Sequence, residues 1–196
     1  MSKDYSLSMS GASARMPESM IAAQTYLELG DWNATRKAII DANLFQLNAV
    51  SSRERIAGEL VKRLRTLTDK EVEFFVNSYG DDRCAVLWCA ICRTYPFVRD
   101  LSIQLVAGRY DRTIPDLTRE AYEAFFEEQA VLHPELSALS RLGKDKIRNV
   151  IFRMLDECHL IDSNGRITLL HPTPAFKSAL GPEHADDVLL FPGRVA

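Results

Sequence analysis

The sequence predicts an all-α protein, mainly a helical bundle, that ends in a winged helix-turn-helix carrying a small β-hairpin. Apolar residues recur at three- and four-residue spacing along most of the chain, which is the period of an amphipathic helix. Capping signals separate one such segment from the next. Near the C-terminus, Asn164-Gly165 lies between two β-prone runs, 159–161 and 166–169, and this pattern is typical of a tight hairpin.

Composition limits the classes of protein that the chain can form. The chain has 196 residues and 46% hydrophobic content, which is enough for a genuine core. Its net charge of −3 lacks the basic excess typical of nucleic-acid binding, so such a function would depend on local charge. No signal-peptide pattern opens the chain, and the most apolar stretch, 85–92, is shorter than the roughly twenty residues of a membrane span. We therefore expect a cytoplasmic protein without a membrane partner.

The N-terminal region divides into an arm and the first helices of a bundle. Residues 1–17 are small and polar without a period, which predicts a flexible arm. Pro17 then opens a helical pattern that continues to residue 29. Gly30 and Asp31 end that helix and cap the next one, which we expect over 32–42.

Two capping signatures predict the next helices of the bundle. Ser51 with Glu54, and Thr68 with Glu71, both match the capping box that precedes a helix. The apolar spacing after the first signature is the clearest amphipathic pattern in this half. Two more helices are expected over 82–95 and 97–110. The first of these is apolar nearly all round, which predicts a helix at the centre of the bundle.

A break at Pro115 predicts a domain boundary, because proline disfavours helix at the preceding residue. This assigns 18–114 to a helical, helix-turn-helix-like bundle and 115–180 to a winged-helix domain. Thr118 caps a helix, Pro134 starts a short one, and a long helix is expected over 142–158. Residues 181–196 carry no period and are expected to form an irregular tail.

The polar face of the predicted long helix indicates DNA binding. Lys146, Asn149 and Arg153 lie at i, i+3 and i+7, so they share one face, and Lys144 and Arg148 flank them. A major groove admits such a helix, with cations on phosphates, an Asn edge suited to adenine, and Arg148 or Arg153 suited to guanine. The predicted DNA-binding residues of this half are Lys144, Lys146, Arg148, Asn149, Arg153 and, just after the hairpin turn, Arg166.

A second basic face is expected on the helix that follows Ser51. Together with the 32–42 helix it resembles a helix-turn-helix pair, although the connection is longer than usual. A solvated bundle surface is the stronger interpretation of this face. Its candidate DNA contacts are Arg53, Arg55, Lys62, Arg63 and Arg65.

No pattern in the sequence predicts catalysis, a cofactor or a metal site. Cys89 and Cys92 form a CxxC inside an apolar helix without a second pair, so buried structural thiols are expected. The four histidines are scattered without metal-ligand spacing. Phosphate-binding glycine loops, nucleophile elbows and HExxH are absent from the sequence. We therefore expect a protein that is not an enzyme.

Several strings, taken in order, resemble the BrxA family of bacterial BREX phage-resistance systems. They are YLELGDW at 26–32, SSRERI at 51–56, RLRTL at 63–67, LWCAICR at 87–93, HPEL at 133–136 and KIRNVIFRML at 146–155. The resemblance covers about residues 5 to 180. It implies a mainly helical, DNA-binding protein that works beside the methyltransferase, ATPase and other components of the system to block phage replication.

Two further functions stay open at this point. The basic faces could meet acidic partners in a protein–protein adaptor of the same defence assembly, since some winged helices bind only protein. RNA binding is weaker, because aromatic residues do not alternate with the cations as they do in a stacking platform. The primary expectation is double-stranded DNA as the partner, with other BREX components as possible partners and the oligomeric state open.

Overall fold

The structure, a computed structural model, describes residues 5, 7, 9 and 12–193. These residues form α-helices, one π-helix and one 3-10 helix, which confirms the predicted all-α class. Within the described residues β-pairing is limited to two isolated antiparallel bridges and no sheet forms. No helix of this part of the chain is both long enough and apolar enough to cross a membrane.

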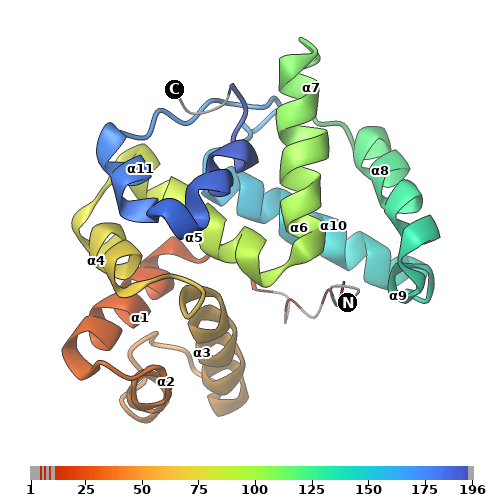
Figure 1. Cartoon of the computed structure of the whole chain (residues 1–196). Coiled ribbons are helices and arrows are strands. Elements are labelled where there is room, and N and C mark those ends of the chain that lie inside the picture. The colour runs from red at the N-terminus through yellow and green to blue at the C-terminus, as the bar shows by residue number, and fades with distance from the viewer. Residues whose placement is uncertain (1–4, 6, 8, 10–11, 194–196) are drawn as a thin grey trace.

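Four helices of the N-terminal half lie together at one end of the molecule (Figure 1). Asp31 accepts a hydrogen bond from the backbone N of Ala34 at 2.7 Å, and Thr68 with Glu71 forms the predicted capping box. The box predicted at Ser51 is wrong, because the helix already begins at Val50 and Ser51 lies inside it. The four helices are α1 (Met16–Leu29), α2 (Trp32–Asp41), α3 (Val50–Leu64) and α4 (Asp69–Asn77).

The centre of the molecule is α5 (Gly80–Thr94), as its apolar sequence predicts. Residues 85–91 of this helix are at most 1% exposed. The helix predicted over 97–110 is a continuous rod in Figure 1, but its middle has a wider π-helical winding. The Trp88 indole donates to Ser102 Oγ in that segment at 2.8 Å. The rod consists of α6 (Pro96–Asp100), η1 (Leu101–Ala107) and α7 (Gly108–Asp111).

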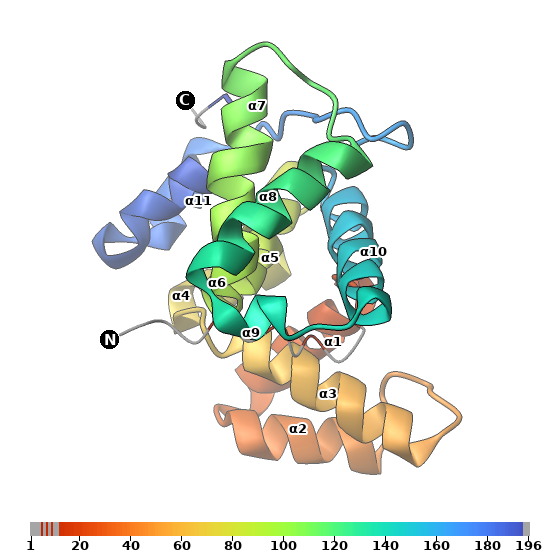
Figure 2. The same ribbon diagram turned by 90° about the vertical axis from the view of Figure 1, so that its right-hand side faces the viewer.

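The C-terminal half places two long helices beside the rod. Figure 2 shows α8 and α10 at one side of the molecule, joined at one end by α9. The predicted hairpin turn follows α10, but its two runs pair only through a bridge between Ile161 and Ile167, and a second bridge joins Asp116 to Arg166. The helices are α8 (Arg119–Leu132), α9 (Pro134–Ser137), α10 (Arg141–Glu157), α11 (Pro174–Leu180) and η2 (Pro182–Leu190).

The tail predicted as irregular instead contains a helix, so the prediction is wrong for residues 182–190. Residues 182–190 form the 3-10 helix η2, and Leu190 and Phe191 are fully buried. Asp187 accepts hydrogen bonds from Arg93 at 2.7 Å and from Arg99 at 2.6 Å. These partners lie more than eighty residues earlier in the chain, so the periodicity of the tail carries no sign of them. Residues 194–196 lie outside the described part.

Most of the described residues of the arm predicted as flexible are buried. Tyr5 is 3% exposed and its ring stacks on His133, with 3.5 Å between the ring centroids. The carbonyl oxygens of Ala12 and Ser13 accept hydrogen bonds from Arg63 on α3. Residues 1–4, 6, 8, 10 and 11 lie outside the described part. The described arm residues therefore connect α3 with the start of α9.

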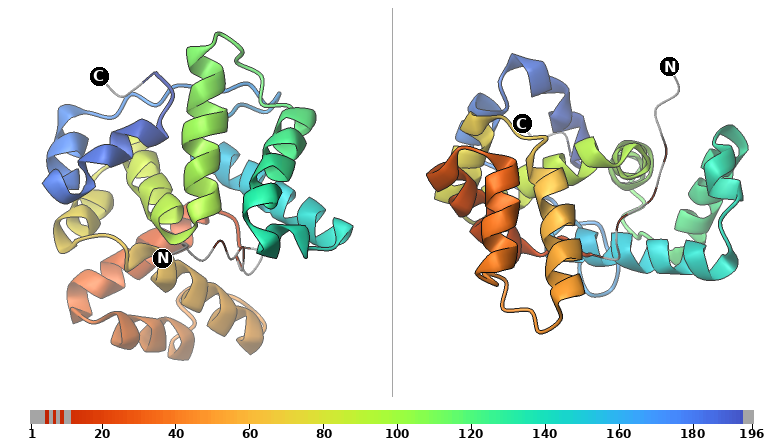
Figure 3. Two further views of the ribbon diagram at one scale, coloured as in Figure 1. Left: turned by 45° about the vertical axis from the view of Figure 1, so that its right-hand side comes forward. Right: turned by 90° about the horizontal axis from the view of Figure 1, so that it is seen from below.

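The predicted boundary at 114/115 falls in the loop between α7 and α8. One hydrophobic cluster continues across it, with Phe97 of α6 packed against Phe125 and Phe126 of α8 at 5.6 and 5.5 Å between ring centroids. Figure 3 shows the α8–α10 group on one side of the rod and α1–α4 on the other. The division into two domains stays a prediction.

We expect the fold to lose stability in acid through Glu71. Burial raises the pKa of this carboxyl, but hydrogen bonds from Arg93 and the Thr68 backbone outweigh that effect and hold the pKa below its usual value of 4.5. A carboxylate with a depressed pKa stabilises the fold above its unfolded-state pKa, and this contribution is lost as the pH falls through its folded-state pKa. The free energy of unfolding, measured in urea, should therefore fall below about pH 4.5.

Glu71→Gln is the matched control, because glutamine keeps the capping box and loses the charge. This variant should be less stable at neutral pH and should lose less of its stability in acid. An acid dependence equal to that of the unmodified protein would contradict the role of Glu71.

Candidate nucleic-acid interface

Helix α10 has both an N-cap residue at its start and an apolar stripe along its length, and both favour a helix over the same residues. Ser140 is the N-cap residue, and its Oγ accepts a hydrogen bond from the backbone N of Gly143 at 3.1 Å. The Phe152 ring meets the Tyr122 ring of α8 edge to face, at 5.8 Å between centroids. The buried stripe, as predicted, consists of Ile147, Val150, Ile151, Met154 and Leu155, followed by Cys158.

The side of α10 away from this stripe carries the predicted row of polar side chains. Lys146, Asn149 and Arg153 are all exposed. Within the described residues, neither Lys146 nor Arg153 has an ion-pair partner, and Asn149 Oδ1 accepts only a long contact of 3.4 Å from Arg148. The structure therefore brings these three predicted residues together on one open face, which we call the α10 row.

Lys144 and Arg148 do not belong to the α10 row, although the sequence placed them beside it. Lys144 Nζ lies 2.9 Å from Glu127, and Arg148 Nη1 lies 2.7 Å from Asp145 and 3.2 Å from Glu123. The Arg148 side chain is only 13% exposed. Because α8 carries Glu123 and Glu127, these two cations point toward α8 and pair with its carboxylates. Their prediction as open donors is corrected accordingly.

The ion pairs between α8 and α10 could have been anticipated from the spacing of charged residues in the sequence. Arg119, Glu123 and Glu127 follow one another at four-residue spacing, so they share one face of α8. Arg119 Nε lies 2.7 Å from Glu123, and its Nη2 lies 3.5 Å from Asp145 of α10. A charged face of this kind beside a basic helix predicts pairing between the two helices.

Arg166 occupies an exposed position just after the hairpin turn. Asp162 Oδ1 accepts hydrogen bonds from the backbone N of Asn164 at 2.8 Å and of Arg166 at 2.9 Å. Gly165 has a φ of 77°, which glycine adopts without strain. The Arg166 side chain is 63% exposed and lies 3.7 Å from Asp116. The local turn thus fixes where this cation leaves the backbone.

Arg63 is not a surface residue, so its prediction as an exposed cation of the second basic face is wrong. Its side chain is 0% exposed and lies 2.9 Å from Glu59. Its guanidinium also donates to the carbonyl oxygens of Ser13 at 2.6 Å and Ala12 at 2.9 Å. The helix period alone places Arg63 at the edge of the basic face. The N-terminal arm, fifty residues away in sequence, covers that edge.

The other cations of the second basic face remain at the surface of α3 but have local contacts. Arg53 donates to the Leu47 carbonyl oxygen at 2.7 Å, and Arg65 donates to Asn33 at 2.9 Å. Lys62 lies 4.7 Å from the centroid of the Tyr95 ring, and Arg55 is exposed. These contacts fix the loop before α3 and the packing of α3 on α2, so this face is a weaker candidate than the α10 row.

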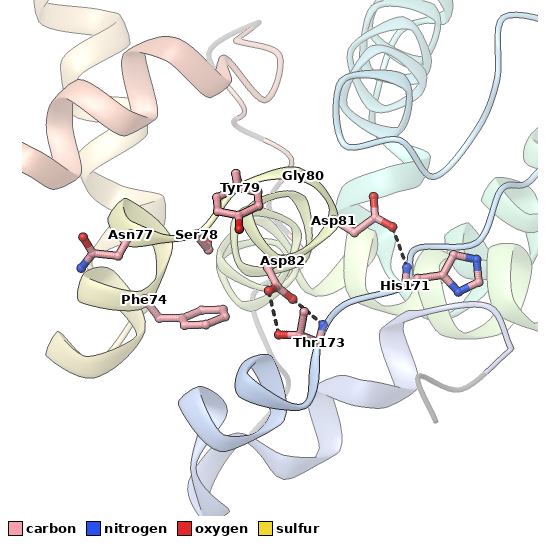
Figure 4. A pocket seen from close by; sticks show the side chains of 9 residues that line it. All are labelled: Phe74, Asn77, Ser78, Tyr79, Gly80, Asp81, Asp82, His171 and Thr173. Atoms are coloured by element: carbon pink, nitrogen blue, oxygen red, sulfur yellow. Dashed lines mark hydrogen bonds between the residues drawn. The ribbon is translucent and has the colours of Figure 1, made fainter.

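A hollow of about 590 Å³ lies where α4 meets α5 (Figure 4). Asp81 accepts a hydrogen bond from the backbone N of His171 at 2.7 Å. Asp82 accepts two from Thr173, at 2.6 Å from the backbone N and 2.8 Å from Oγ1. These carboxylates attach the 171–173 segment to the start of α5. Across the described residues, no three His, Cys, Asp or Glu side chains are arranged to hold a metal ion.

The four cysteines are free and buried, as expected for structural thiols. Burial raises the pKa of Cys89 and Cys92 well above the ordinary value, and raises the pKa of Cys84 to about 11. A thiol must ionise to act as a nucleophile or metal ligand. At neutral pH these side chains therefore stay protonated and serve as small apolar groups.

These features define an all-helical protein whose C-terminal helix pair carries an exposed row of basic and amide side chains. The chain belongs to the BrxA family, which it matches over residues 3–183. It is 24% identical over 177 residues to the BREX protein BrxA of Escherichia coli O9:H4 (strain HS), covering 88% of this chain and 83% of that protein. The fold is similar to the crystal structure of an uncharacterized protein from Magnetospirillum magneticum, with a TM-score of 0.82 and 21% identity over 96% of this chain and 97% of that one.

Proposed function

We propose that this protein is a non-catalytic, cytoplasmic DNA-binding component of a bacterial phage-defence system and that α10 contacts double-stranded DNA. The observation that carries the proposal is the α10 row, in which Lys146, Asn149 and Arg153 are exposed together and the two cations lack acidic partners among the described residues. Cations of this kind suit phosphates, and the amide suits a base edge. The defence role rests on the family and on the relative's name as a BREX protein.

The arrangement around α10 supports a winged helix-turn-helix. A short extended segment precedes α8, and its Leu117 N donates to the Gly165 carbonyl oxygen of the hairpin turn at 2.8 Å. In return, Ile167 N donates to the Pro115 carbonyl oxygen at 2.6 Å. Along the chain the order is the extended segment, α8, α9, α10 and the hairpin turn. Backbone hydrogen bonds connect the turn to the extended segment. In this proposal α10 is the helix that enters the major groove and Arg166 lies on the wing.

Salt dependence tests the proposal directly. Purified protein is titrated against labelled double-stranded DNA at two salt concentrations. Each phosphate that a cation neutralises should lower log affinity by about 0.9 per unit of log salt concentration. We expect a measurable slope and a weak sequence preference. If no complex forms even at low salt, direct DNA binding is abandoned.

A protein–protein adaptor is the second candidate, and exposed apolar side chains favour it. Val131 and Leu132 end α8 at 83% and 70% exposure, and Leu142 begins α10 at 81%. Val131 and Leu132 are adjacent in the chain, and contiguous exposed apolar surface often marks a protein interface. The double substitution Val131→Ser with Leu132→Ser should then abolish co-purification with other defence components while leaving DNA affinity unchanged.

RNA binding would instead appear as competition by RNA in the DNA titration.

A further inference from the structure

A groove of about 320 Å³ lies between α8 and α10, beside the α10 row. Both helices line it with charged side chains, and the Tyr122 and Phe126 side chains of α8 complete its lining. Of its lining residues on α10, Arg141 and Asp145 precede the α10 row in the sequence, and Arg148 lies between its first two members. A duplex that faces the α10 row would therefore carry phosphates past the mouth of this α8–α10 groove.

The charges of the α8–α10 groove leave one cation in excess. Four cations and three carboxylates line it. Arg141 is exposed and, among the described residues, has no ion-pair partner. Glu123 and Glu127 are 49% and 67% exposed, and ion pairs at such positions contribute little stability. An arriving anion can therefore replace these carboxylates at small cost, since both can turn into solvent.

The Tyr122 hydroxyl is an independent sign of a missing acceptor. The residue is 2% exposed, and its hydroxyl has no hydrogen-bond partner among the described residues. Burial raises the pKa of Tyr122, while the neighbouring Arg148 charge opposes the shift, so the hydroxyl stays a donor. A buried donor without an acceptor is unusual, because leaving it unsatisfied is costly. Tyr122 also lines the groove, so a donor that has no acceptor among the described residues lies there beside the charge of Arg148.

We propose that the α8–α10 groove binds a phosphate group, with Arg119, Arg141 and Arg148 as cationic contacts and Tyr122 as a neutral donor. The phosphate belongs either to the DNA backbone or to a small phosphorylated molecule. Phosphate oxygens accept several hydrogen bonds at once, and guanidinium groups match them in geometry. The DNA source rests on the proposed function, whereas the small-molecule source does not.

The first arm of the test measures thermal unfolding with inorganic phosphate as the probe. Phosphate is compared with chloride at equal ionic strength, so that screening is matched. At ten times the dissociation constant, ligand binding should raise the unfolding midpoint by about 3 °C for a chain of this size. Arg119→Gln with Arg141→Gln should abolish this shift, and Tyr122→Phe should reduce it. Arg36→Gln with Lys37→Gln, on α2, is the control of equal charge change.

The second arm measures the salt dependence of DNA binding with the same variants. If the phosphate comes from DNA, the Arg119→Gln, Arg141→Gln variant should lower the slope by about one to two units, and the α2 control should not. A slope that stays unchanged, together with a phosphate shift in the first arm, assigns the groove to a small phosphorylated molecule.

The outcomes separate this proposal from DNA binding itself. A phosphate shift that is absent, or equal in the groove variant and the unmodified protein, together with an unchanged slope, overturns the groove as a phosphate site and leaves DNA binding standing. If the unmodified protein binds no DNA, the proposed function fails, and the first arm alone decides on the groove.

Discussion

Lys146→Glu with Arg153→Glu should remove most of the DNA affinity. Both side chains are exposed members of the α10 row, so the change removes two donors and places two acids against phosphates. Each contact of this kind is worth about 1–3 kcal/mol, so the loss of two predicts an affinity loss of roughly thirtyfold or more. The slope of log affinity against log salt concentration should also become shallower, by about 0.9 for each of the two phosphate contacts that are lost. Titration of labelled duplex at two salt concentrations measures both quantities.

The matched control is Arg55→Glu with Lys62→Glu on α3, which makes the same charge change on the second basic face. It should weaken binding less. Circular dichroism and the unfolding midpoint should be unchanged in the α10 variant, because the substitutions do not touch the buried stripe. Small and equal losses in both variants, with unchanged stability, would mean that the charges are only solvated surface and would favour the adaptor.

Arg63→Ala should lower the free energy of unfolding by about 3–5 kcal/mol, the cost of breaking a buried ion pair from one side. The substitution leaves the Glu59 carboxylate buried without its partner at 2.9 Å. It also leaves the carbonyl oxygens of Ala12 and Ser13 without their donor. Urea unfolding monitored by Trp fluorescence measures the loss, and the N-terminal arm should become accessible to proteolysis.

Glu59→Leu with Arg63→Met is the control for this prediction. Replacing both partners of a buried ion pair with apolar residues is often close to neutral, so the double variant should recover much of the stability. The recovery should be partial, because Tyr95 loses its acceptor on Glu59. A loss of less than about 1 kcal/mol in Arg63→Ala would contradict the role of this cluster. Because the Arg63 side chain is buried, we expect any loss of DNA binding in Arg63 variants to result from the lower stability of the fold.

Helix positions could be predicted because their causes are local. The Thr68–Glu71 capping box and the apolar spacing of α10 each depend on residues a few positions apart. The same local view failed at η1, where the π-helical winding accompanies a hydrogen bond from Trp88 to Ser102. It failed again in the tail, where Arg93 and Arg99 hold Asp187. Both failures involve partners that are distant in sequence.

The candidate site could be predicted in part for the same reason. Spacing along one helix is enough to place Lys146, Asn149 and Arg153 on a common face. Whether a cation on that helix is open depends on its neighbours, and α8 supplies the carboxylates that bind Lys144 and Arg148. The single sequence contains both helices but gives no distance between them.

The sequence by itself determined the all-α class, most helix boundaries and the composition of the α10 row, because helix formation follows periodicity and capping within a few residues. Only the tertiary structure decided which charges are available. It buried Arg63 under the N-terminal arm and turned Lys144 and Arg148 toward α8. Charge availability depends on desolvation and on ion pairs between segments far apart in the chain, and these exist only once the helices have packed.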